Sequence, residues 1–187
     1  MRKLRLAAVG GGAVAEAVHL PALTLSGQAE AAILIDKSLP RAAALAAQFG
    51  VPAVAADYRE VIGRADAAVV GLPHHLHAEV ACDLLRHGLH VLVEKPMALR
   101  ARDCDAMLEA AAGSGCVLTV GLLRRFSESL RFVKQALDGG LIGKVLSFDL
   151  REGGVYGWPV ASDAMFRPEA GGVLADAGAH ALDLVLW

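Results

Sequence analysis

Residues 3–15 read KLRLAAVGGGAVA, an apolar run that breaks into three glycines and then continues with small apolar residues. This pattern predicts a strand followed directly by a helix, the setting in which a GxGxxG/A sequence binds a dinucleotide. Gly10 permits the tight turn, Gly12 lets the backbone approach a pyrophosphate, and Ala15 keeps the helix close to the strand. The loop residues predicted to bind the cofactor are Gly10, Gly12, Ala13, Val14 and Ala15. Similar loops bind other nucleotides, so the cofactor assignment needs a second feature.

Asp36 supplies that feature, because it ends the second predicted strand about 20 residues after the loop, where a carboxylate accepts hydrogen bonds from the adenosine ribose. The same carboxylate disfavours a 2′-phosphate, which predicts NAD as the cofactor, with Lys37 also in its site. Two alternatives stay open. Lys37, Ser38 and Arg41 could instead receive the 2′-phosphate of NADP, and Asp36 could cap the helix that follows.

From the loop to residue 120, short β-branched runs alternate with longer stretches rich in alanine and leucine. This alternation is typical of repeated βα units and predicts an α/β fold with a Rossmann-type, doubly wound parallel sheet. The predicted strands cover residues 3–9, 31–35, a short stretch near 53, 67–71, 90–93 and 117–120. The predicted helices cover residues 13–26, 40–49, 58–62, 75–87 and 99–112.

The rhythm of the sequence changes near residue 126, which divides the chain into two predicted parts. Residues 1–122 are expected to form an NAD(P)-binding Rossmann domain, and residues 123–187 to begin an α+β, mainly antiparallel, substrate domain. The second part is predicted to contain a helix ending near 139–140, a strand over 145–151 and a helix over 172–187. Because one strand cannot form a sheet and the last helix has no closing turn, we expect this domain to be incomplete.

The composition is typical of a globular protein, with 55% hydrophobic residues, 20% charged residues and a formal net charge of -2. There is no basic cluster to bind nucleic acid, and no uncharged run reaches the ~18 residues that a membrane helix needs. The three cysteines are widely spaced and are predicted to be reduced. We therefore expect a cytoplasmic protein that binds a small-molecule substrate and has no nucleic-acid or membrane partner.

Three histidines, His74, His75 and His77, lie in the turn that begins at Pro73, after the fourth predicted strand. A zinc site would need a fourth ligand, which the neighbouring sequence does not supply, so no metal is predicted. Ligands of open parallel sheets bind beyond the carboxyl ends of the strands. Pro73, His74 and His77 are therefore predicted to line the cofactor cleft.

Glu94 and Lys95 end the fifth predicted strand at the same edge of the sheet, and Pro96 stiffens the turn that follows. Charged side chains held at this edge are candidates for cofactor binding and catalysis. The alternative is an ion pair that closes a loop.

A second candidate lies near the end of the chain, where Asp176, His180 and Asp183 are spaced to share one helix face. A histidine flanked by carboxylates can act as a general base. The alternative is a capping aspartate beside a buried histidine.

Together these residues resemble the glucose-fructose oxidoreductase/inositol dehydrogenase/MocA (Gfo/Idh/MocA) family. The matching segments are Gly10-x-Gly12-x-x-Ala15-x-x-x-His19, Asp36, Pro73 to His77, Glu94-Lys95-Pro96, Ile142 to Val145, and Gly171-Gly172 through Asp176, His180 and Asp183. The resemblance implies an NAD(P)-dependent oxidoreductase that moves a hydride between the nicotinamide and a hydroxyl-bearing carbon of a sugar, polyol or related substrate. It also implies a homo-oligomer for the full-length form.

The resemblance further implies that Lys95, Asp176 and His180 are catalytic. His180 would be the base, Asp176 would orient its imidazole, and Lys95 would hold the substrate oxygen. The loop residues expected near the substrate are Tyr156, Trp158 and Arg167. Two alternatives stay open: an NAD-dependent glycoside-cleaving member of the same family, and a dinucleotide-binding fragment that catalyses nothing.

Overall fold

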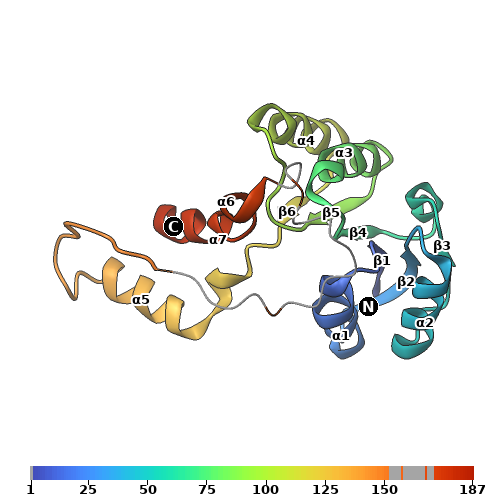
Figure 1. Ribbon diagram of the computed structural model, residues 1–187, viewed down its shortest axis with the longest axis horizontal. Coiled ribbons are helices and arrows are strands. Elements are labelled where there is room, and N and C mark those ends of the chain that lie inside the picture. The colour runs from blue at the N-terminus through green and yellow to red at the C-terminus, as the bar shows by residue number, and fades with distance from the viewer. Residues whose placement is uncertain (1, 152–156, 158–166, 168–170) are drawn as a thin grey trace.

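The computed structural model describes residues 2–151, 157, 167 and 171–187. Its centre is a six-stranded parallel sheet in the order β3-β2-β1-β4-β5-β6 (Figure 1). The strands are β1 (Leu4–Val9), β2 (Ala29–Ile35), β3 (Val54–Ala55), β4 (Ala67–Val70), β5 (His90–Val93) and β6 (Leu118–Val120). Each predicted strand before residue 121 is present, and the sheet confirms the Rossmann-type α/β fold.

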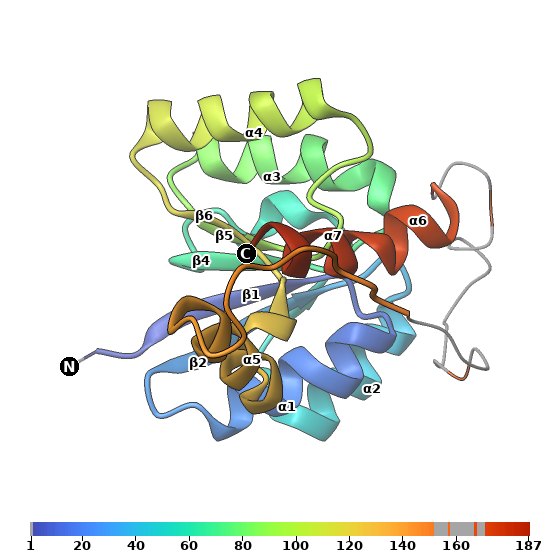
Figure 2. The same ribbon diagram turned by 90° about the vertical axis from the view of Figure 1, so that its left-hand side faces the viewer.

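Helices cover both faces of the sheet, with α1 and α2 on one face and α3 and α4 on the other (Figure 2). The α-helices are α1 (Leu20–Leu25), α2 (Leu39–Phe49), α3 (His77–Arg86), α4 (Ala101–Ser114), α5 (Glu128–Asp138), α6 (Gly172–Asp176) and α7 (Gly178–Leu186). The remaining helices are the π-helix η1 (Ala15–His19) and the 3₁₀ helices η2 (Tyr58–Val61), η3 (His74–Leu76) and η4 (Leu123–Phe126). Within the part of the chain that the structure describes, no helix is long and apolar enough to cross a membrane.

The main core lies between the sheet and the layer formed by α3 and α4. All four residues of β4 are buried, as expected for a central parallel strand that is covered on both faces. Leu84 and Leu85 of α3 and Met107 of α4 are fully buried in the same cluster. A smaller cluster on the opposite face includes Leu20, Leu34 and Leu45. Burial on both faces explains why the strands are continuous apolar runs rather than alternating ones.

The predicted strand over residues 145–151 is not formed, which corrects the expectation from sequence. Its apolar side chains Val145, Leu146 and Phe148 are exposed, and no described strand pairs with the segment. An alternating pattern shows which face of a strand could be buried, but the strand itself needs a hydrogen-bonded neighbour.

Several predicted helices differ in detail from the structure. The helix expected over 172–187 is divided at Ala177 into α6 and α7. The helix expected over 13–26 contains a π-helical turn, η1, before α1. In that turn the Leu20 N–H donates to the Ala15 carbonyl, five residues back, so the turn holds one residue more than an α-helical turn.

Candidate active site

The glycine loop lies where β1 ends, beside the point at which the strand order reverses between β1 and β4. Ligands of open α/β sheets bind in the crevice at such a point. Gly10 has a φ of +107°, and a Cβ atom there would lie 2.3 Å from the Gly71 carbonyl oxygen, so only glycine fits. A Cβ atom added at Gly12 would have no atom within 4 Å, so there is open space beside its backbone. The loop can therefore receive a pyrophosphate, as its sequence predicts.

Asp36 directly follows β2, next to this loop, and holds the loop in place. The Gly11 N–H donates to Asp36 Oδ2 over 2.9 Å, and the Ser38 N–H donates to Oδ1 over 2.7 Å. Arg41 Nη2 lies 2.8 and 2.9 Å from the two carboxylate oxygens. The carboxylate thus joins the loop to the start of α2, and the Arg41 guanidinium stands beside the predicted ribose site.

His77 does not line a cleft, which corrects its predicted role. Its side chain is fully buried, with Nδ1 2.9 Å from the Pro96 carbonyl oxygen and Nε2 2.8 Å from that of Leu72. Burial lowers the pKa of His77. The imidazole therefore ties the turn after β4 to the turn after β5. His74 stays at the predicted edge, with its ring centroid 5.7 Å from that of His77, and no metal-binding group of His, Cys, Asp and Glu is found among the described residues.

Glu94 follows β5 and is held between two neighbouring strand ends. A Cβ atom at Gly121, after β6, would lie 3.1 Å from each carboxylate oxygen, so the glycine makes room for the carboxylate. His19 Nε2 lies 2.9 Å from Glu94 Oε1, and the Lys95 N–H donates to Oε2 over 3.2 Å. Burial alone raises the pKa of Glu94, but the contacts with His19 and Lys95 outweigh it and lower the pKa below its ordinary value.

Lys95 extends from the same turn to α6. Its ammonium contacts the Asp176 carboxylate directly and donates to the Asp176 carbonyl oxygen over 3.2 Å. His180, one turn further on in α7, is 8% exposed. The structure thus brings Asp176 to Lys95, whereas the expected contact between Asp176 and His180 stays a prediction.

Asp183 has a partner that the sequence did not reveal. Arg125 Nε donates to Asp183 Oδ2 over 2.8 Å, and the guanidinium carbon lies 5.6 Å from the centroid of the Trp187 ring. These contacts hold α7 against η4, beside the end of β6 (Figure 1). Of the residues expected near the substrate, Tyr156 and Trp158 lie outside the described residues, and Arg167 is exposed.

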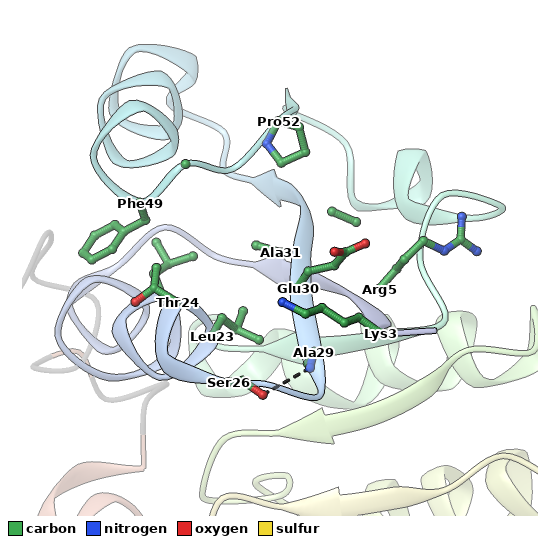
Figure 3. Close-up of a pocket in the computed structure, with 13 residues that line it drawn as sticks. Lys3, Arg5, Leu23, Thr24, Ser26, Ala29, Glu30, Ala31, Phe49 and Pro52 are labelled. Atoms are coloured by element: carbon green, nitrogen blue, oxygen red, sulfur yellow. Dashed lines mark hydrogen bonds between the residues drawn. The ribbon is translucent and has the colours of Figure 1, made fainter. Parts of the chain in front are cut away.

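A hollow of about 540 Å³ lies elsewhere, between the first residues of β1 and β2 and the last residues of α1 and α2 (Figure 3). Lys3, Glu30 and Phe49 are among the residues that line it, and no predicted site residue does. It is therefore separate from the candidate active site, which lies at the carboxyl ends of the strands.

A dinucleotide-type glycine loop and a lysine–aspartate contact at the carboxyl edge of a parallel sheet define a Rossmann-fold protein of the oxidoreductase class. Residues 4–122 match the model of a family described as "Oxidoreductase family, NAD-binding Rossmann fold", that is, Gfo/Idh/MocA, and the chain belongs to this family.

The similar proteins include enzymes that act on sugars. The chain is 30% identical to D-glucoside 3-dehydrogenase of Escherichia coli K12 over 98% of this chain and 53% of that one. A solved NAD-binding protein of Listeria innocua superposes with a TM-score of 0.88 at 27% identity, over 99% of this chain and 54% of that one. The WlbA dehydrogenase of Bordetella pertussis, solved with NADH and UDP-GlcNAcA, superposes with a TM-score of 0.71 at 30% identity. The superposition covers 76% of this chain and 42% of that one. The chain thus spans about half the length of these relatives or less.

Proposed function

We propose that this chain is the cofactor-binding and catalytic-lysine part of an NAD(P)-dependent oxidoreductase that acts on a hydroxyl-bearing carbon of a sugar, polyol or related compound. The observation that carries the proposal is the contact between Lys95 and Asp176 at the same edge of the sheet as the glycine loop. Sugar dehydrogenases among the relatives support the class of substrate. The predicted division at residue 122, the cytoplasmic location and the homo-oligomeric state stay predictions.

The residues present fit a dinucleotide. The open space at Gly12 and the helix that begins at Ala13 suit a pyrophosphate, and Asp36 lies where the adenosine ribose is bound in this fold. The nicotinamide, when bound, supplies the hydride chemistry. The chemistry at the substrate oxygen is left to protein side chains.

Three side chains divide the remaining work. The Lys95 ammonium donates to the substrate oxygen and stabilises negative charge that develops there. Asp176 holds that ammonium at the end of α6, which fixes its direction. His180 takes the proton of the substrate hydroxyl as a general base, because an uncharged imidazole has a nitrogen lone pair that can accept a proton.

The cofactor is NAD in this proposal, because Asp36 places a buried carboxylate after β2 and beside the glycine loop, where this fold binds the ribose. Arg41 is the side chain that would favour NADP, since it is 41% exposed and already lies against that carboxylate. A 2′-phosphate would have to draw Arg41 away from Asp36 and approach the carboxylate itself. NADP is therefore expected to bind more weakly.

The proposal is tested in two steps. Titration of the chain with NADH and NADPH, followed by cofactor fluorescence, should show binding of NADH. Turnover is then measured on the full gene product with NAD+ and a panel of sugars and polyols, because the relatives are about twice as long as this chain. Lys95→Ala should suppress that turnover. Absence of dinucleotide binding, or a Lys95→Ala enzyme as active as the unmodified one, would contradict the proposal.

A further inference from the structure

We infer that Glu94 and His19 together set the preference of this site for the oxidised over the reduced cofactor, with Glu94 favouring NAD+ and a cationic His19 opposing it. The inference rests on the proposed function, since it concerns how the same site treats the two redox forms. It is carried by the placement of one buried carboxylate and by the charges around it.

The carboxylate of Glu94 is strongly shielded from solvent. Its side chain is 12% exposed, and that of His19 is 14% exposed. Gly121, after β6, leaves room for both carboxylate oxygens. Gly71 follows β4, and a Cβ atom added there would lie 4.0 Å from Glu94 Cγ. A charge held in such surroundings acts on its neighbours more strongly than one in water.

Glu94 belongs to the half of the sheet that receives the nicotinamide. Asp36, after β2, lies on the adenosine side of the strand-order reversal, and β4, β5 and β6 lie on the other side. In this fold the dinucleotide crosses the reversal point from one half to the other. The nicotinamide half of the cofactor therefore comes to the strand ends that flank Glu94.

Other ionisable groups close to Glu94 in the fold contribute little net charge. Lys95 and Asp176 contact each other, so their opposite charges offset. Burial lowers the pKa of His77, which favours its uncharged form. The net charge around Glu94 then depends on His19, whose Nε2 lies 2.9 Å from Oε1.

The two redox forms of the cofactor differ in charge at the nicotinamide ring. The ring of NAD+ is a cation, and that of NADH is neutral. An unbalanced Glu94 carboxylate stabilises the cationic ring and leaves the neutral one almost unaffected. A protonated His19 cancels that stabilisation, because an imidazolium beside the carboxylate neutralises it.

The test compares the dissociation constants of NAD+ and NADH for the chain and its variants, with thermal unfolding as a check that each variant is folded. Glu94→Gln should weaken NAD+ relative to NADH by about tenfold, which corresponds to about 1.4 kcal/mol. His19→Lys should also weaken NAD+ binding relative to NADH binding. His19→Gln should leave the ratio of the two dissociation constants unchanged or shift it in favour of NAD+. A change in the ratio of the NAD+ and NADH dissociation constants corresponds to a shift in the reduction potential of the bound cofactor. A purely structural role of these residues would not produce such a shift.

Glu16→Gln is the matched control, because Glu16 is an exposed carboxylate on the same helical segment as His19. Its ratio should stay within about twofold of the unmodified chain. If Glu94→Gln leaves the ratio equally unchanged, or if His19→Lys and His19→Gln shift it alike, the inference is wrong while the proposed function stands. If neither NAD+ nor NADH binds the unmodified chain, the proposed function itself fails.

Discussion

Lys95 and Asp176 are 81 positions apart in the sequence and in direct contact in the structure. The contact joins the turn after β5 to α6, so it connects the Rossmann sheet to the segment that carries His180.

Two glycine substitutions in the cofactor loop should have different effects. Gly12→Ala meets no atom within 4 Å, so the chain should keep its stability while NADH binding weakens, because the added methyl occupies space that the pyrophosphate needs. Gly10→Ala should lower both the stability and the NADH affinity, since its Cβ would lie 2.3 Å from the Gly71 carbonyl oxygen. Thermal unfolding and NADH titration distinguish them. A Gly12→Ala chain that binds NADH normally would remove this loop from the cofactor site.

Arg41 should decide how strongly NADP is rejected. Arg41→Ala removes the cation beside Asp36, so NADPH binding should weaken by about tenfold while NADH binding changes little. Asp36→Asn should weaken NADH and reduce the difference between the two cofactors. Parallel titrations with NADH and NADPH measure both effects. Tighter NADPH than NADH binding by the unmodified chain would show that Arg41 outweighs Asp36.

His180→Ala in the full gene product should lower turnover by about 10²- to 10⁴-fold, the range expected when a general base is lost. Cofactor affinity should stay nearly unchanged, because His180 lies in α7 rather than in the glycine loop. The measurements are steady-state kinetics and NADH titration. Turnover equal to that of the unmodified enzyme would exclude His180 as the base.

Tyr58 should ionise at unusually high pH. Its partial burial and its hydrogen bond to Asp83 Oδ2, 2.8 Å long, raise its pKa to about 12. Since the ordinary value is about 10, its contribution to stability is present below pH ~10 and is lost as the pH rises through the folded-state value. Phenolate absorbance should therefore show a late step that Tyr58→Phe removes, leaving the signal of Tyr156. A Tyr58 step near pH ~10 would contradict this.

The sequence predicts the sheet well because buried parallel strands are continuous apolar runs. Candidate residues can be placed at strand ends because they directly follow these runs. It does not predict contacts between distant side chains. His77 resembles a cleft residue in sequence, yet its ring fills the space between two turns. Arg125 and Asp183 meet only because α7 packs beside η4. The missing strand over 145–151 has a similar cause, since a strand depends on a neighbour that its own residues do not specify.

The π-helical turn at Ala15–His19 gives the first helix one surplus residue. Each residue of an α-helix advances the side chains by about 100° around its axis, so the surplus changes which residue faces Glu94 at the end of β5. In a regular α-helix of the same length, the His19 side chain would point in a different direction around the helix axis. In evolutionary terms, the contact between His19 and Glu94 could be acquired or lost by inserting or deleting a single codon, without any substitution at either residue.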